Sequence, residues 1–213
     1  CKSSHSFLLI CMGWVGLSSV KRKVNGKVIS SIFNFQISNL LGLQILDLHD
    51  NQLETLPDSI SALTRLTKLN LSHNRLARYP RVCDNQSETS IASNQPITGI
   101  YDLLELHNLA ASNNHIEALD ERIADLNRLV SLDMAHNKLR TLPGSVGFLS
   151  KVTSLNLASN SLESIPSEVS SMSSLASLDL TNNKLREVPE SLKDLGHLGN
   201  TIQAFGFASH FIL

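Results

Sequence analysis

Serine, histidine and aspartate residues, whose types suit catalysis, occur close together in this 213-residue chain. Ser72 and His73 are direct neighbours, and Asp50 precedes His73 by 23 residues. These residue types form the nucleophilic triad of many hydrolases. A catalytic triad works inside a cleft, however, and the neighbouring positions of Ser72 and His73 on one strand edge do not imply a cleft. We therefore expect no catalytic residues here.

Metal and cofactor sites are also not expected. The chain has no Cys-x-x-Cys pair to ligate zinc, and it has no phosphate-binding loop, metalloprotease, serine-hydrolase or kinase motif. The protein is predicted not to be an enzyme and to need no cofactor.

The charge balance bears on the class of partner. Eighteen Lys and Arg against nineteen Asp and Glu give a formal net charge of -1, so no unbalanced field attracts nucleic acid or an acidic membrane. The apolar run at residues 7–17 is about half the length needed to cross a bilayer. We expect neither a nucleic-acid partner nor a membrane span.

The polar residues must be positioned by a 23-residue repeat, which recurs as L-x-x-L-x-L-x-x-N-x-L. The alternating leucines predict a short strand with the leucines inward and the intervening residues outward. The asparagine that follows can satisfy the backbone groups of a sharp turn through its amide. We therefore predict an internal asparagine ladder, which consists of Asn51, Asn74, Asn114, Asn137, Asn160 and Asn183.

The copies LQILDLHDNQLETLP, LVSLDMAHNKLRTLP and LASLDLTNNKLREVP resemble the leucine-rich-repeat family. In particular they resemble its intracellular 23-residue class with an LP step, which includes Ras-pathway scaffolds. The resemblance covers Leu43 to about Leu198. It implies an α/β fold, a leucine-rich-repeat solenoid (horseshoe) with a short-stranded parallel sheet on the concave face, and a binding role. No single copy can bury its apolar face, so the copies must stack.

Three segments are predicted. Residues 1–40 form an N-terminal segment with a half-repeat cap, residues 41–198 the repeat array, and residues 199–213 an apolar tail. The tail lacks the polar residues of a terminal cap, so either it folds back as an unusual cap or the chain is a fragment. Within the array, Asp120 stands where the pattern expects proline and Ala111 replaces a core leucine.

One interval between ladder asparagines, from Asn74 to Asn114, is 40 residues instead of 23. Residues 81–105 are rich in polar turn formers and are predicted to be an irregular insertion. Insertions into solenoids emerge as loops on one face and often carry function. A pair of shorter, irregular repeats is the alternative, because Asn94 lies 20 residues from each of these two asparagines.

Partner-binding residues are predicted on the concave sheet, where outward side chains of successive strands align into columns about 4.8 Å apart. Four aspartates against one lysine make this surface mildly acidic, so a protein partner should bring Lys, Arg or amide donors. Aromatic residues, which dominate many interfaces, are absent from it. The histidines fall in different columns or in non-adjacent repeats, which disfavours a metal site. The predicted binding residues are Asp47, His49, Asp50, Lys68, Asn70, His73, Asn108, Asp133, His136, Asn156, Asp179 and Asn182.

The predicted function is that of an intracellular adaptor or scaffold that binds a protein. Three scattered cysteines, none clustered at an end of the array, favour a reducing compartment and hence the cytoplasm. One alternative is a substrate-recognition or regulatory module of a larger enzyme complex, such as a ubiquitin ligase or phosphatase. The other is a secreted or receptor-ectodomain fragment, which predicts cleavage near Leu17 and a glycan on Asn85.

Overall fold

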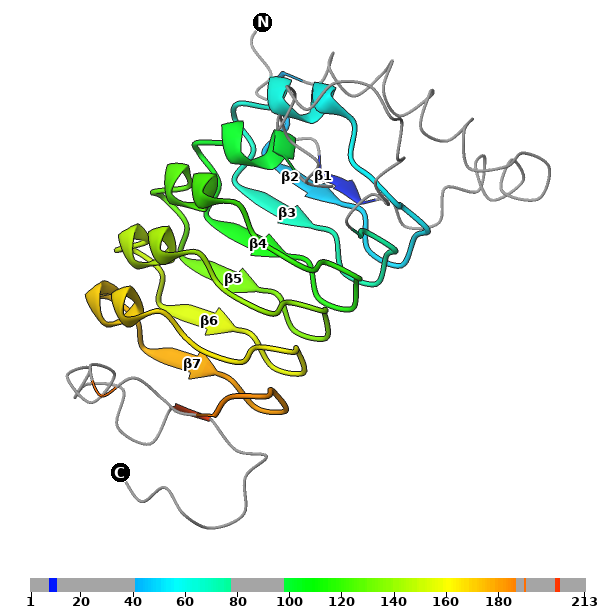
Figure 1. The fold of residues 1–213 in the computed structure, drawn as a ribbon. Helices are drawn as coiled ribbons and strands as arrows, with labels where there is room; N and C mark the ends of the chain where they lie inside the picture. The colour runs from blue at the N-terminus through cyan, green and yellow to red at the C-terminus, as the bar shows by residue number, and fades with distance from the viewer. Residues whose placement is uncertain (1–7, 11–40, 78–97, 187–189, 191–201, 204–213) are drawn as a thin grey trace, which may run out of the picture.

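The computed structural model describes residues 8–10, 41–77, 98–186, 190 and 202–203, which stack into a solenoid (Figure 1). Parallel strands follow one another in chain order as one sheet. Their bounds are Leu8–Ile10 (β1), Ile45–Asp47 (β2), Lys68–Asn70 (β3), Asn108–Ala110 (β4), Ser131–Asp133 (β5), Ser154–Asn156 (β6), Ser177–Asp179 (β7) and Ile202–Gln203 (β8). The predicted solenoid with a short-stranded parallel sheet is confirmed.

Single 3-10 turns follow β2 to β6 on the convex side, at the left in Figure 1. They are Asp58–Ala62 (η2), Thr98–Asp102 (η3), Glu121–Asp125 (η4), Gly144–Phe148 (η5) and Ser167–Ser171 (η6). The extended proline of the LP step precedes η2, η5 and η6, because a fixed φ near −65° suits the start of such a turn.

The core is a stack of leucines in constant register. The middle residue of each strand pairs with the middle residue of the next, as in Leu132 beside Leu155 and Leu155 beside Leu178. These side chains are fully buried, and burying one leucine stabilises a fold by about 1.5–3 kcal/mol. The constant register from strand to strand aligns the outward side chains of β2 to β7 in columns.

The asparagine ladder joins each turn to the preceding repeat. Asn160 Nδ2 donates to the carbonyl of Leu157 in its own repeat and to that of Met134 in the previous one, both at 3.0 Å. Its Oδ1 accepts from Leu139 N at 3.0 Å. The same three kinds of bond recur at Asn74, Asn114, Asn137 and Asn183. At Asn51 the described bonds are those that its amide donates within its own repeat.

Asp120, which replaces the expected proline, makes bonds that proline cannot. Its backbone N–H donates to Tyr101 Oη at 3.2 Å, and its carboxylate caps η4 by accepting from Arg122 N at 2.9 Å. Burial raises the pKa of Tyr101 to about 12, so the phenol stays protonated. Ala111, the other departure, is buried and offers its carbonyl to the ladder amide of Asn137 at 2.9 Å.

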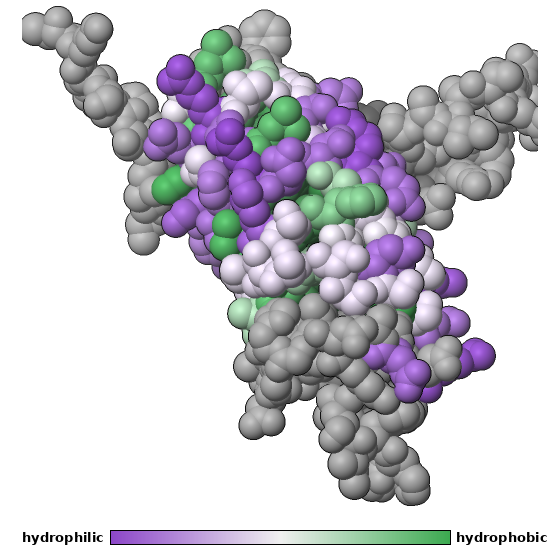
Figure 2. Space-filling view, turned by 90° about the vertical axis from the view of Figure 1, so that its left-hand side faces the viewer, coloured by the Kyte–Doolittle hydropathy of each residue, from purple (hydrophilic) through white to green (hydrophobic). Residues whose placement is uncertain are grey.

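The convex face changes character along the solenoid (Figure 2). Hydrophilic side chains crowd the upper part of that view. Between η3 and η4, Arg122 pairs with Asp102 at 2.6 Å and with Asp125 at 3.1 Å. The lower part is paler and carries the serine-rich η6. Between η5 and η6 the backbones touch: a Cβ on Gly147 would lie 2.3 Å from the carbonyl oxygen of Glu168, so any side chain at position 147 forces these turns apart.

The sheet extends beyond the sequence pattern at both ends. β1 lies in the predicted N-terminal segment and pairs with β2, the first strand of the array. The sequence pattern assigned no element to the part of that segment before its half-repeat cap. At the other end, β8 lies in the predicted apolar tail and pairs with β7. The half-repeat cap itself lies outside the described residues. Within the part of the chain that the structure describes, no helix is long and apolar enough to span a membrane.

Across the 40-residue interval the sheet is continuous, because β3 pairs directly with β4 and Leu69 is in register with Leu109. Most of the predicted insertion, residues 81–105, lies outside the described residues; of its remainder, Thr98–Asp102 form η3. The ladder continues across the interval, because Asn114 Nδ2 donates to the carbonyl of Leu71 at 2.9 Å.

Candidate protein-binding surface

The concave sheet carries a hollow of about 450 Å³ that spans β2 to β5. We call it the concave hollow. Its floor is formed by the strand leucines. Its polar lining residues come from two columns, one on each side of the inward leucine, and are Asp47, Lys68, Asn70, Asn108, Ser131 and Asp133. Five predicted binding residues therefore share one depression.

The remaining predicted binding residues lie outside the concave hollow. Asn156 and Asp179 continue one of its columns along β6 and β7. The others follow the strands and are His49, Asp50, His73, His136 and Asn182.

The column after the inward leucine has a structural role that the sequence analysis missed. Each aspartate or asparagine in it accepts a hydrogen bond on Oδ1 from the backbone N–H two residues later, at 2.9–3.1 Å. The backbone N–H needs this acceptor because the carbonyl of the preceding repeat is already used. The carbonyl of Leu48, for example, accepts from the amides of Asn51 and Asn74, and Ser72 N donates to Asn70 Oδ1 instead. The column residues are Asp47, Asn70, Asp133, Asn156 and Asp179.

The side chains of the column before the inward leucine, unlike those of the column after it, make no hydrogen bond within the described residues. Lys68, Asn108 and Ser131 line the concave hollow, and none of their side chains has a hydrogen bond or ion pair within the described residues. Lys68 is exposed, and Asn108 and Ser131 are half-buried. These three side chains are therefore available to a ligand without loss of an internal contact.

The row that follows the strands is held in left-handed backbone. Its members have φ between 53° and 57° and are Asp50, His73, Asn113, His136, Ser159 and Asn182. Asparagine and aspartate tolerate this region better than other residues with a Cβ. The backbone N–H of His73 donates to the carbonyl of Ser112 at 2.9 Å, and that of His136 to Ala158 at 2.8 Å, so the row serves chain reversal.

His49 carries the described surface's clearest histidine–carboxylate contact. Its Nδ1 donates to Asp47 Oδ1 at 2.7 Å, and its Nε2 lies 3.5 Å from Asp50 Oδ2. The hydrogen bond to Asp47 raises the pKa of His49 above its usual value of 6.5, while desolvation offsets part of the rise. The pair lies at the edge of the concave surface.

The possible triad residues are not arranged as a triad. His73 Nδ1 lies 3.8 Å from Asp50 Oδ1, which exceeds a hydrogen bond. Ser72 is buried, and its hydroxyl accepts from Ser112 Oγ at 3.1 Å instead of contacting His73. Among the described residues, no group of three or more His, Cys, Asp or Glu side chains is placed to hold a metal.

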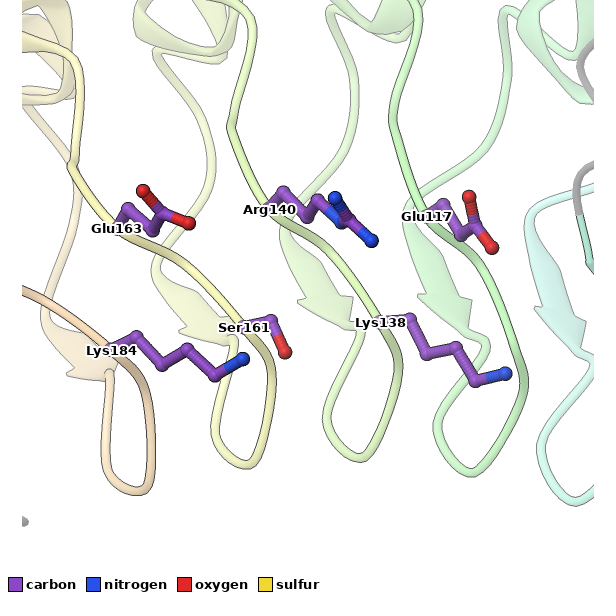
Figure 3. A pocket seen from close by; sticks show the side chains of 6 residues that line it. All are labelled: Glu117, Lys138, Arg140, Ser161, Glu163 and Lys184. Carbon is purple, nitrogen blue, oxygen red and sulfur yellow. The ribbon is translucent and has the colours of Figure 1, made fainter.

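A second hollow, which sequence analysis missed, lies on the flank after the ladder asparagines (Figure 3). We call it the flank groove. Its volume is about 270 Å³, and its lining residues are Glu117, Lys138, Arg140, Ser161, Glu163 and Lys184. The pattern contained the signal: these residues are the first and third after each ladder asparagine, and they align as columns in the same way as the concave ones.

Comparison with known families identifies the repeat. A family model described as "Leucine-rich repeat region" matches residues 78–201, more than half of the chain, and a second, "Leucine rich repeat", matches residues 24–76. The chain belongs to the leucine-rich-repeat family. The fold of this family supports a role as a protein–protein interaction module.

Solved structures with the same fold include several plant ectodomains. The leucine-rich-repeat ectodomain of the receptor kinase GASSHO1/SCHENGEN3 from Arabidopsis thaliana, in complex with CASPARIAN STRIP INTEGRITY FACTOR 2, is 26% identical with a TM-score of 0.64; the match covers 80% of this chain and 19% of that one. The BIR2 ectodomain from Arabidopsis thaliana is 28% identical with a TM-score of 0.50, and the match covers 68% of each chain.

A third structure shows the fold alone. It is the plant peptide hormone receptor RGFR1 in complex with RGF2, which is 24% identical with a TM-score of 0.60; the match covers 76% of this chain and 24% of the receptor. The chain thus spans a quarter or less of the length of RGFR1 and of the GASSHO1/SCHENGEN3 ectodomain.

Proposed function

We propose that this chain is a non-enzymatic intracellular adaptor or scaffold whose concave hollow binds a protein partner in the cytoplasm. The observation that carries the proposal is the concave hollow itself, where Lys68, Asn108 and Ser131 face an open depression with no internal partner among the described residues. Because the sheet already orders the backbone that carries these side chains, binding costs little backbone conformational entropy.

The proposal includes the intracellular 23-residue class with an LP step. The copies LQILDLHDNQLETLP and LTKLNLSHNRL support it, because they look most like the protein called leucine-rich repeat-containing protein forty. The scattered cysteines support a reducing compartment in the same way.

The lining chemistry favours a particular kind of partner segment. Asp47 and Asp133 use Oδ1 for their local turns, which leaves each Oδ2 to accept from an arginine or lysine of the partner. Lys68, between them in chain order, offers a donor for a carboxylate or carbonyl. Ile45 and Ala110, which are half-buried, add apolar contact. A partner segment with basic residues around a single acceptor fits this arrangement.

The test is affinity capture from cell lysate followed by mass spectrometry, with wild-type chain as bait beside three variants. Asn108→Arg and Ser131→Arg each fill the concave hollow without removing an internal bond. Ser174→Arg is the matched control, because Ser174 is exposed and lies outside the hollow. Circular dichroism and thermal melting check that all four fold alike.

Proteins that co-purify with wild type and with Ser174→Arg, and that both hollow variants lose, are the expected result. Partners retained by both hollow variants contradict the assignment of this surface.

A receptor-ectodomain fragment is the second candidate, because two solved structures of similar fold with identities above 25% are plant ectodomains. This candidate predicts that the chain, expressed behind a secretory signal, acquires a glycan at the Asn85 sequon that Asn85→Gln abolishes. Intact mass of the secreted product distinguishes the two. Poor secretion without a glycan supports the adaptor.

A further inference from the structure

The flank groove is built from two rows that cross successive repeats (Figure 3). One row, directly after the ladder asparagines, runs Lys138, Ser161, Lys184. The other, two residues later, runs Glu117, Arg140, Glu163. Ser161 is half-buried. Because its side chain is short and lies between two lysines in the row, it creates the depression.

Backbone hydrogen bonds hold both rows at nearly the spacing of the sheet. Ser161 N donates to the carbonyl of Leu139 at 2.9 Å, and Lys184 N to that of Leu162 at 2.9 Å. In the other row, Glu163 N donates to the carbonyl of Arg140 at 3.3 Å. The backbone beneath the groove is thus joined from repeat to repeat by hydrogen bonds, as the strands beside it are.

Among the described residues, the cations of the flank groove have no carboxylate partner. Across the part of the chain that the structure describes, no carboxylate lies within 4.0 Å of the charged groups of Lys138, Arg140 or Lys184. The arginines of the convex side behave differently: Arg122 and Arg128 both form ion pairs. In Figure 3 the side chain of Lys184 extends towards Ser161, and that of Arg140 towards Glu117.

We propose that the flank groove is a second protein-binding site, which takes an extended acidic segment of a partner. One carboxylate of the segment accepts from Lys184 and from the hydroxyl of Ser161, and another accepts from Lys138, with Arg140 between them as a planar donor. Charge-assisted hydrogen bonds to carboxylates are among the stronger polar contacts in proteins.

The repeat spacing sets the spacing of the acidic residues. Lys138 and Lys184 are two repeats apart, or about 9.6 Å at the strand spacing of a sheet. In a polyproline II segment, residues three apart lie on one face and are separated by about 9.3 Å. The segment therefore carries Glu or Asp at every third position. Glu117 and Glu163 disfavour a continuous polyanion, which distinguishes such a segment from nucleic acid.

The experiment is fluorescence anisotropy with a fluorescein-labelled peptide that carries glutamate at every third position in a proline and alanine background. A peptide of the same composition with glutamate at every second position is the spacing control, and a single-stranded oligonucleotide of equal charge is the polyanion control. The protein variants are Lys138→Glu and Lys184→Glu. Lys151→Glu is the matched control, because Lys151 is exposed and lies outside the groove.

The expected result is saturable binding of the every-third peptide to wild type and to Lys151→Glu, weakened about tenfold by either groove variant, the loss expected for one charge-assisted hydrogen bond. Lys68→Glu should leave this binding unchanged, because it alters only the concave hollow, so the two sites fail independently. The proposal is overturned by absence of binding, by equal binding of either control ligand, or by groove variants that bind as wild type does.

Discussion

Two asparagines four residues apart in one repeat show how position within the repeat determines what a side chain does. Asn160 is buried, donates to three carbonyls and accepts from one backbone N–H. Asn156, on the concave face, is half-buried and accepts from the backbone N–H of Ala158 at 3.1 Å. The first side chain is fully committed to the fold, whereas the second keeps its amide N–H groups for a partner.

The difference explains the residue choice in each column. A ladder position needs a donor and an acceptor on the same side chain, and all six ladder positions are asparagine. A concave position needs only an acceptor, so Asp133 and Asn156 are equivalent there, and Ala110 is tolerated in β4. Substitutions that exchange aspartate and asparagine between the columns therefore test the comparison directly.

The largest effect is expected from Asn160→Asp. The new carboxylate is nearly isosteric but cannot donate, and it faces the carbonyls of Met134 and Leu157 in a buried position. Each carbonyl keeps a second donor, Asn137 for Met134 and Asn183 for Leu157, but a buried carboxylate held against two carbonyl oxygens should still cost roughly 3 kcal/mol or more. Urea unfolding followed by circular dichroism measures the loss. A variant within 1 kcal/mol of wild type, on the scale of an ordinary substitution, contradicts the ladder's role.

A smaller effect is expected from Asp133→Ala. This variant removes the acceptor for Ala135 N, a half-buried bond of 3.1 Å, and a typical hydrogen bond contributes about 1 kcal/mol. The same urea titration measures it. A loss as large as that of Asn160→Asp would show that the concave column is as structural as the ladder.

A still smaller, pH-dependent effect is expected at His49. Because the folded pKa of His49 is raised above 6.5, its pair with Asp47 stabilises the fold fully below about pH 6.5. That contribution is lost as the pH rises through the folded pKa. The side chain is half exposed, so solvent screens the pair.

Wild type should therefore lose slightly more stability between pH 5.5 and pH 8.5 than His49→Gln does, as measured by urea unfolding at both values. Identical pH dependence of the two proteins argues against the pair.

The smallest effect is expected from Asp133→Asn, which keeps the Oδ1 acceptor and removes only the charge. Its unfolding free energy should lie within about 0.5 kcal/mol of wild type. Thermal melting of both proteins checks this. Because the fold is unchanged, any loss of partner capture by this variant reports the charge of the concave hollow alone.

The sequence predicted the solenoid and the columns because each depends on a strict local period. The central leucine of every strand and the asparagine five residues later determine register, so Leu132 and Asn137 suffice to place their repeat. β1 and β8 were not predicted, because Leu8–Ile10 and Ile202–Gln203 lack that asparagine and join the sheet only through β2 and β7.

The candidate site was predicted in outline but not in role. Outward alternation placed Asp47 and Asp133 on the concave face, yet it could not show that their Oδ1 atoms cap the strand ends. That role arises because the ladder amides occupy the carbonyls of the preceding turn, which is a contact between repeats. The flank groove was not predicted, because the residues after Asn137 and Asn160 lie outside the strand alternation from which the binding residues were predicted.

Site-specific photocrosslinking tests most directly whether the concave hollow binds a protein. A photoreactive phenylalanine analogue placed at Asn108, and in a separate chain at Ser174, is irradiated in cells, and adducts are identified by mass spectrometry. We predict protein adducts from position 108 that are absent from position 174. Adducts from position 174 alone, or none from position 108, would contradict binding through the concave hollow.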